Sequence, residues 1–394
     1  MGKTNRADTE AERCFEIQKR CSGRSRAADA VTLCLFGALV ITAALFVWLA
    51  PQKSFSENEN RYLVTREKID FSLGMEYFTK GIADMYADQF PLRSELIEAK
   101  ARIETALGKG ENNGVIVAEN DLLVTKSEYS AAEKQTVFDN VFAIKEFSEA
   151  MCADGARVSF AAVPRATDFF DDPPFYSGER ADSVWKMIES VEYIDLGEVT
   201  SNDGYIHFKT DHHWTALGAY YAYRALADPL GYEPIPLTDF SERTVSDSFY
   251  GTTWSKSGAY WIKPDKISIF EHRDDDKITV YDCQSENEID LGLYDESKLE
   301  TKDKYAVFLG GDHAHIKISG GAEKPRLLVI KDSYFNSLAP FLCRHFELDV
   351  IDLRYFSGSV AEYAREQGID KILILCGLDS LASAPTFTAL RYKI

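Results

Sequence analysis

Cysteine is scarce in this chain and never clustered. The 394 residues include seven cysteines, and no two of them stand in a C-x-x-C spacing. A zinc knuckle or a small disulfide-bonded scaffold needs closely spaced cysteines, so neither is expected. Cys343 and Cys376 stand among apolar residues, and we expect them to behave as small core hydrophobes.

Basic residues are also few. The chain has 44 Lys and Arg against 63 Asp and Glu, a formal net charge of −19. Because phosphate binding needs a basic face, no nucleic-acid partner is expected. The sequence lacks the H-E-x-x-H signature, internal repeats and low-complexity tracts. Its 45% hydrophobic content is ample for a sizeable core, in one large domain or two smaller ones.

Long apolar runs are absent except at residues 31–50, which carry no charge. At helical rise this run matches the hydrocarbon thickness of a bilayer, and Trp48 stands near its end, where interfacial aromatics are common. Residues 1–26 carry a net charge of +3 and the remainder −22. We therefore expect a signal anchor with a cytoplasmic N-terminus. A cleavable signal peptide is the alternative.

The expected organisation follows from this anchor. It consists of a cytoplasmic tail at 1–26, a transmembrane anchor at 27–50, a polar linker at 51–73 and an extracytoplasmic domain at 74–394. The protein would then be a single-pass protein of the cell membrane with its large domain outside. Within that domain, residues 74–108 look helical with a break at Pro91, and Asn113-Gly114 predicts a turn before a short strand at 115–117.

From about residue 130, helical and strand patterns alternate, which indicates an α/β fold with a mostly parallel sheet covered on both faces. Thr215 is the expected N-cap of one helix, and Pro229 its expected stop. Residues 240–300 break the rhythm and predict an inserted β-rich segment, a candidate substrate wall or lid. The predicted helices are 131–153, 182–190, 215–228 and 358–368; the predicted strands are 158–163, 193–196, 266–271, 277–281, 305–309, 327–330, 348–353 and 371–376.

Two segments contain the residue types of acyl chemistry. Asp211 and His213 stand two residues apart, and Ser333 directly follows an apolar run that reads as a strand. Together they supply a nucleophile, a base and a carboxylate that orients the base. The alternatives are an N-cap role for Ser333 and a purely structural His–Asp contact. A further alternative is a metal site of His207, Asp211 and His213 with His313 or His315.

Other residues are candidates for supporting roles. Gly310 and Gly311 follow a predicted strand, and Asn336 stands one turn after Ser333, so these three are oxyanion-hole candidates. A plain turn is the alternative for the glycines. Substrate-binding candidates are Arg165, which follows a strand, and an aromatic platform of Trp254, Tyr260 and Trp261, for which a core position is the alternative.

These residues belong to segments that resemble the DHHW proteins, a family of bacterial cell-surface proteins. That family is similar to the periplasmic proteins of alginate O-acetylation, which have an SGNH-hydrolase-like domain. The resemblance extends from the linker onward. It rests on S-E-N-E-N-R at 56–61, D-Q-F-P-L-R at 88–93, T-D-H-H-W-T at 210–215, F-Y-G-T at 249–252, F-L-G-G at 308–311, I-K-D-S-Y at 330–334 and I-D-L-R-Y at 351–355.

The resemblance implies an SGNH-like three-layer sandwich and a triad in which Asp-x-His precedes the serine. Carried over by residue, Asp211, His213 and Ser333 match. The leading glycine of the Gly-Asp-Ser block is replaced by Lys331, and Asp312 stands where an asparagine is expected, as does Gly377. These departures concern the oxyanion hole more than the triad.

The implied function is a membrane-anchored O-acetyltransferase acting on a cell-surface polysaccharide. A multi-pass membrane O-acyltransferase is the partner expected to supply acetyl groups, since a single span cannot form a channel. No cofactor and no metal are expected. The alternatives are a carbohydrate acetyl esterase with the same triad and a non-catalytic glycan-binding surface protein.

Overall fold

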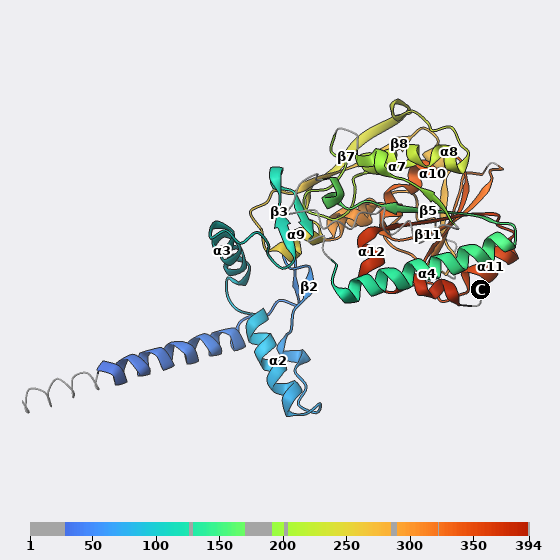
Figure 1. The fold of residues 1–394 in the computed structure, drawn as a ribbon. Helices are drawn as coiled ribbons and strands as arrows, with labels where there is room; N and C mark the ends of the chain where they lie inside the picture. The colour runs from blue at the N-terminus through green and yellow to red at the C-terminus, as the bar shows by residue number, and fades with distance from the viewer. Residues whose placement is uncertain are drawn as a thin grey trace, which may run out of the picture. The chain divides into compact units, whose positions relative to one another are not determined.

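The computed structural model describes residues 28–125, 129–169, 191–200, 204–284, 290–321 and 323–392 (Figure 1). The chain separates into two compact units, residues 1–97 and 98–394, each described here by itself. This division falls after the expected boundary at residue 74. The helix predicted at 182–190 lies outside the described residues.

The first unit contains an apolar helix, Ala28–Leu49, that is long and apolar enough to cross a membrane. The segment expected to be a plain linker contains structure: β1 (Phe55–Ser56) pairs with β2 (Arg61–Tyr62). Arg61 forms an ion pair with Asp88 at the end of α2 (Met75–Asp88), and Arg93 forms one with Glu59. The helix α3 (Arg93–Ala106) follows, so the predicted helical region with a break near Pro91 is confirmed.

A seven-stranded sheet forms the centre of the second unit, with strand order β6-β5-β13-β11-β12-β10-β9. The first five strands in this order are parallel, while β10 runs antiparallel to both of its neighbours. The prediction of a mostly parallel α/β sheet is therefore confirmed. The strands are β5 (Arg157–Val163), β6 (Glu192–Ile194), β9 (Thr279–Asp282), β10 (His315–Ser319), β11 (Arg326–Lys331), β12 (Glu347–Asp352) and β13 (Lys371–Gly377).

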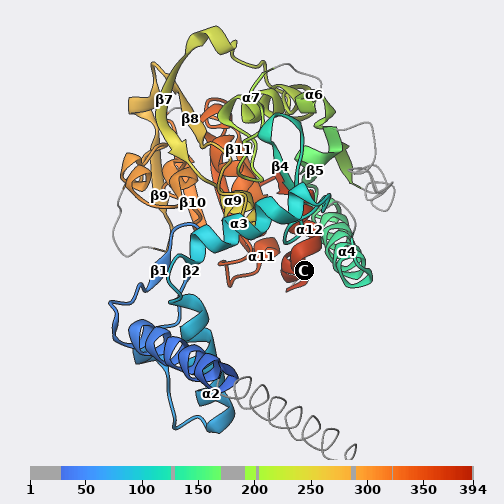
Figure 2. The ribbon, with the colours of Figure 1, turned by 90° about the vertical axis from the view of Figure 1, so that its left-hand side faces the viewer.

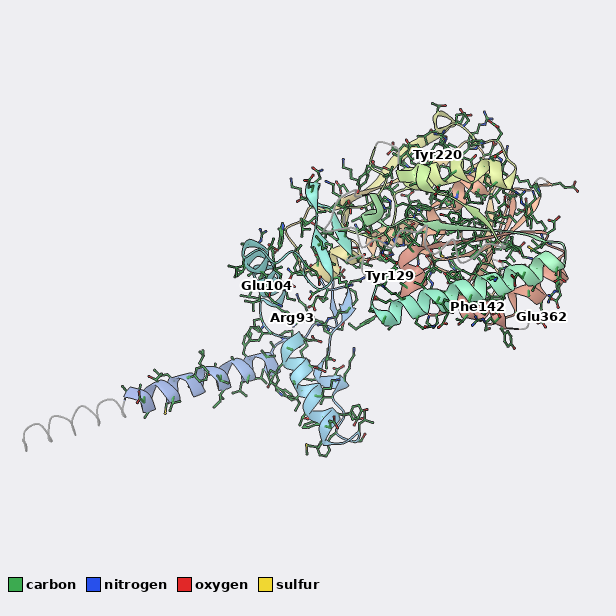
Figure 3. All side chains as sticks on the ribbon, viewed as in Figure 1. Arg93, Glu104, Tyr129, Phe142, Tyr220 and Glu362 are labelled. Atoms are coloured by element: carbon green, nitrogen blue, oxygen red, sulfur yellow. The ribbon has the colours of Figure 1, made fainter. Side chains whose placement is uncertain are left out.

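One face of the sheet is covered by α4 (Ala131–Ala153), α11 (Val360–Gln367) and α12 (Leu378–Ser383). The other face is covered by α7 (Ala216–Ala225), α10 (Ala339–Leu342) and the 3-10 turn η8 (Ser333–Ser337). Phe142 on α4 and Tyr220 on α7 mark the two sides in Figure 3, and Figure 2 shows the layers from the side.

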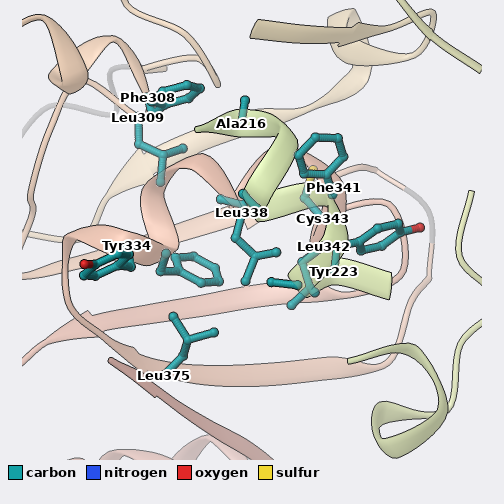
Figure 4. Close-up of a cluster of buried hydrophobic side chains, with 14 of the residues drawn as sticks. Ala216, Tyr223, Phe308, Leu309, Tyr334, Leu338, Phe341, Leu342, Cys343 and Leu375 are labelled. Atoms are coloured by element: carbon teal, nitrogen blue, oxygen red, sulfur yellow. The ribbon is translucent and has the colours of Figure 1, made fainter. Parts of the chain in front are cut away.

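Two buried apolar clusters result from this arrangement. The cluster on the α7 side includes Leu338, Phe341 and Leu342, close to Tyr223 (Figure 4). Its Tyr223 and Phe341 rings stack with centroids 5.7 Å apart. Cys343 and Cys376 are fully buried in these clusters, as expected for small core hydrophobes.

The β-rich insertion is present, but it is divided between two sheets. β7 (Phe240–Phe249) and β8 (Asp265–His272) pair with one another as a separate antiparallel ribbon, whereas β9 joins the edge of the main sheet. The short helix α9 (Thr252–Ser257) lies between the ribbon strands in sequence. A further small ribbon consists of β3 (Val115–Val117) and β4 (Leu123–Thr125). Two further short helices are α6 (Gly197–Thr200) and α8 (Ala227–Leu230).

Two sequence predictions are wrong. The run predicted as a strand at 305–309 begins as a 3-10 turn, η7 (Lys304–Val307), and Leu309 has a positive φ of 59°. All five side chains of the run are buried, so apolar character alone could not separate a strand from a buried turn. Pro229 does not end a helix either. It lies in the first turn of α8, where a missing N–H is tolerated.

Candidate active site

The structure brings Ser333, His213 and Asp211 into one hydrogen-bonded chain. His213 Nε2 lies 2.8 Å from Ser333 Oγ, and His213 Nδ1 lies 2.5 Å from Asp211 Oδ1. Ser333 begins η8, just beyond the carboxyl end of β11, where open α/β sheets bind their ligands. An ionised Asp211 accepts a hydrogen bond from Nδ1–H, which leaves Nε2 as the acceptor for the serine hydroxyl.

Four donors saturate the Asp211 carboxylate. Oδ1 accepts from His213 N–H at 3.1 Å and from His213 Nδ1, and Oδ2 accepts from Thr252 N–H at 2.7 Å and from the Thr252 hydroxyl at 2.9 Å. Burial alone would raise the pKa of Asp211, but the His212 and His213 rings and the Thr252 N–H together hold that pKa well below its usual range. Asp211 is therefore ionised and fixed in orientation at neutral pH.

The histidine segment and the serine segment are joined by Trp214. Its ring is fully buried, and its Nε1 donates to the carbonyl of Tyr334 at 3.0 Å and to Ser337 Oγ at 2.9 Å. Thr215 caps α7 by accepting from Gly218 N–H, as predicted. A buried indole thus holds together two segments that lie 120 residues apart in sequence.

Two tyrosines that the sequence analysis did not single out complete the surroundings of His213. The Tyr305 ring stacks on the imidazole with centroids 4.0 Å apart and planes 10° apart, and its hydroxyl lies 3.0 Å from Ser337 Oγ. The Tyr334 hydroxyl donates to the His212 carbonyl at 2.6 Å. Tyr305 was hidden in the run misread as a strand, whereas Tyr334 directly follows the serine.

Gly251 makes room for the orienting carboxylate. An added Cβ at this position would overlap with Cβ and the carboxylate of Asp211. We predict that Gly251→Ala displaces Asp211 and lowers kcat/KM for an acetyl ester by about 10- to 100-fold, because small displacements of catalytic groups are costly. Gly110→Ala is the matched control, since a Cβ there meets nothing within 4 Å. Equal activity of both variants in a chromogenic ester assay would contradict this reading.

Asp332 is next to the serine but does not contact His213. Its carboxylate instead accepts hydrogen bonds from neighbouring structural elements. Its Oδ1 accepts from Tyr334 N–H at 3.0 Å, and its Oδ2 accepts from Gly377 N–H at 2.7 Å and from Ser380 Oγ at 2.5 Å. Burial raises the pKa of this carboxyl. Asp332 therefore caps η8 and attaches it to the end of β13.

The three oxyanion-hole candidates differ in availability. Asn336 Nδ2 donates to Asp312 Oδ1 at 3.0 Å and to the Gly311 carbonyl at 3.3 Å, and Gly311 N–H donates to the Phe308 carbonyl at 3.1 Å. These two donors are thus engaged within the protein. In the described part of the chain, the N–H groups of Gly310 and Ser333 have no protein acceptor. Leu309, Gly310 and Gly311 all have positive φ, a sharply turned loop of the kind found at functional sites.

A buried ion network accounts for two of the three departures from the expected family pattern, Lys331 and Asp312. The Lys331 side chain is 1% exposed, and its Nζ lies 2.7 Å from Asp312 and 3.1 Å from Asp352. Arg354 also pairs with Asp312, at 2.8 Å, and with Asp352, at 2.5 Å. The lysine in place of glycine and the aspartate in place of asparagine are therefore charge partners, and with Asn336 they fix the loop that carries Gly310 and Gly311.

The substrate-binding candidates lie in more buried positions than the sequence suggested. Arg165 is 5% exposed, with its guanidinium 5.1 Å from the Tyr129 ring. Trp254 is also 5% exposed and packs against Tyr250 and Tyr260 with centroids 4.3 and 4.7 Å apart. For Trp254, this burial fits the core alternative better than an open aromatic platform.

The metal set considered from the sequence is not assembled. His313 lies near the Leu309 carbonyl and Asp282, and His315 lies 3.6 Å from Asp349. Among the described residues, the ligand types that do converge are Asp211, His212 and His213, whose ligand atoms lie within 4.8 Å. Both ring nitrogens of His213 are already engaged with Asp211 and Ser333, so this cluster fits proton transfer better than metal binding.

Comparison with known proteins finds a matching family model and a similar curated protein. The family model described as DHHW protein matches residues 186–351. A curated protein, probable alginate O-acetylase AlgJ of Pseudomonas syringae pv. tomato, is 23% identical over 184 residues. That match covers 43% of this chain and 47% of the relative, so it spans about half the relative's length. The resemblance to the DHHW proteins and to the alginate O-acetylation proteins is thereby confirmed.

Two solved structures share the fold. A DHHW family protein from Eubacterium siraeum aligns with a TM-score of 0.58 at 22% identity, covering 71% of this chain and 95% of its own. Bacillus cereus PatB1, solved with a sulfonyl adduct, aligns with a TM-score of 0.56 at 18% identity, covering 69% and 97%. At these identities the likeness establishes the fold alone.

Proposed function

We propose that this protein is a membrane-anchored O-acetyltransferase that modifies a polysaccharide outside the cytoplasm, with Ser333 as nucleophile. The observation that carries the proposal is the hydrogen-bonded chain from Ser333 Oγ through His213 to the buried Asp211 carboxylate. The DHHW match and the AlgJ relative support the reaction class. The sheet with helices on both faces is consistent with an SGNH-hydrolase-like sandwich.

In the first half-reaction, Ser333 Oγ attacks the carbonyl carbon of an acetyl donor while His213 Nε2 removes the hydroxyl proton. The imidazolium, stabilised by Asp211, then gives this proton to the leaving group. The oxyanion has two candidate donors, the free N–H groups of Ser333 and Gly310. The product is an acetyl ester on Ser333.

In the second half-reaction, a sugar hydroxyl attacks this ester. His213 Nε2 takes the hydroxyl proton and returns it to Ser333 Oγ as the serine leaves. Water in place of the sugar would give an acetyl esterase with the same residues. Ser333 is partly exposed, so water can reach the ester and some hydrolysis is expected alongside transfer.

The proposed function also includes a membrane anchor and an external source of acetyl groups. Helix Ala28–Leu49 would hold the large domain at the outer surface of the membrane, with residues 1–26 inside. Acetyl groups must then reach Ser333 from outside the cytoplasm. We propose a multi-pass membrane O-acyltransferase as the donor.

An activated serine reacts with sulfonyl fluorides, and PatB1 is known with a sulfonyl adduct. We predict that phenylmethylsulfonyl fluoride abolishes esterase activity of the full chain in detergent, with one adduct on Ser333 located by peptide mass spectrometry. The exposed Ser241 provides an internal comparison within the same digest. Full activity after prolonged exposure to the reagent, with Ser333 unmodified, would count against the proposal.

A further inference from the structure

His212 is held in place at three points, none of which uses its Nε2 atom. Its Nδ1 lies 2.9 Å from Thr252 Oγ1, its carbonyl accepts from the Tyr334 hydroxyl at 2.6 Å, and its ring packs against the His213 ring with centroids 3.9 Å apart. The side chain is 35% exposed. The acyl-transfer steps above assign no role to His212, although its ring packs against His213 and lies 3.6 Å from Asp211.

The proton on the His212 ring can be assigned from its partners. The Thr252 hydroxyl has a single proton, and it donates this to Asp211 Oδ2 at 2.9 Å. Thr252 Oγ1 must therefore accept from His212, which places the proton on Nδ1 and leaves a lone pair on Nε2. Burial, and then the neighbouring His213 charge, lowers the pKa of His212 to about 4, so the ring is neutral at pH 7.

The neighbouring ring places this lone pair close to the proposed triad. The Nδ1 edges of His212 and His213 both face the Asp211 carboxylate, at 3.6 and 2.5 Å. Because the two ring centroids are only 3.9 Å apart, His212 Nε2 lies within a few ångströms of the His213 ring. His213 Nε2 contacts Ser333 Oγ at 2.8 Å, so the free lone pair of His212 is close to the reacting serine. In the described part of the chain, no side chain or backbone group occupies His212 Nε2.

We propose that His212 Nε2 accepts a hydrogen bond from the hydroxyl next to the attacking one, which selects acceptors with two neighbouring hydroxyls on a sugar ring. This inference rests on the proposed function. The attacking hydroxyl forms the new ester bond and gives its proton to His213 Nε2, and Ser333 Oγ leaves with that proton. The neighbouring hydroxyl keeps its proton and donates only a hydrogen bond, so His212 determines specificity without exchanging a proton.

Two substitutions separate this role from a structural one. His212→Asn keeps a donor near the Nδ1 position for Thr252 but removes the acceptor at Nε2. His212→Gln instead places an amide oxygen near the Nε2 position. The readout is the ratio of acetylated sugar to free acetate, which does not depend on the fraction of active enzyme.

The experiment uses the full chain in detergent micelles with p-nitrophenyl acetate as donor. The acceptors are a methyl pyranoside and its analogue lacking the hydroxyl beside the acetylated position, which is located by NMR. For wild type, we expect a ratio about tenfold higher with the intact acceptor. His212→Asn should remove this preference, and His212→Gln should restore part of it.

Three results would overturn the inference. The first is equal acetylation of both sugars by wild type. The second is a His212→Asn ratio lowered by the same factor for both sugars, which is the signature of a structural role. A wild-type protein that forms neither acetylated sugar nor acetyl-Ser333 would contradict the proposed function itself, and the mass of Ser333 distinguishes that failure from the first two.

Discussion

Ser333→Ala is expected to lower acetyl-ester turnover by about 10⁴-fold or more. The residual activity would come from substrate binding and oxyanion contacts alone. The substitution removes the single oxygen that lies 2.8 Å from His213 Nε2, so no acetyl-enzyme can form. Steady-state hydrolysis of p-nitrophenyl acetate by the purified full chain measures the loss.

The matched control is Ser241→Ala, which removes the hydroxyl of an exposed residue on β7. It should retain full turnover. Thermal unfolding of both variants checks that neither change disturbs the fold. A Ser333→Ala protein that kept most of its turnover would place the chemistry at another residue. If that remaining activity proved non-enzymatic, the glycan-binding alternative would be favoured.

Asp211→Asn is expected to lower kcat by about 10³- to 10⁴-fold, because an amide cannot satisfy the four donors that now surround the carboxylate. If its NH₂ group faces His213, the imidazole must move its proton to Nε2 and can no longer accept from Ser333. If the NH₂ group faces Thr252, it opposes the Thr252 N–H. Either arrangement disables the base or disturbs α9.

Asp370→Asn is the matched control for the loss of a carboxylate, since Asp370 is exposed. It should leave kcat unchanged. The pH dependence of the remaining Asp211→Asn activity provides a second readout: with the histidine base disabled, catalysis by hydroxide would make the rate rise steadily towards high pH. Turnover within a few-fold of wild type would mean that Asp211 does not orient the base.

The bounds of several helices and strands could be predicted from the local sequence. The helix α4 has the ends that its amphipathic pattern predicted, Ala131–Ala153, and the structure shows a capping box of Ser130 and Glu133 at its start. The strands β5, β11, β12 and β13 were predicted within one or two residues, because short apolar runs between turns are typical of buried parallel strands.

The parts that could not be predicted depend on contacts across the chain. Thr252 meets Asp211 over a separation of 41 residues, and nothing in its local sequence indicates that its hydroxyl fixes both Asp211 and His212. From the sequence, Lys331 is an unexplained departure from the glycine of the family pattern. The structure explains it by its ion pairs with Asp312 and Asp352. Asp211, His213 and Ser333 were predictable as residue types, but their distances were not.

In the proposed reaction, Ser333 carries the acetyl group between donor and acceptor. The most direct measurement is rapid quenching of the full chain with an acetyl donor, followed by peptide mass spectrometry. We expect an acetyl group on Ser333 that appears within one turnover and is discharged when a sugar acceptor is added. Product formation with no acetyl group on Ser333 at any time would contradict it.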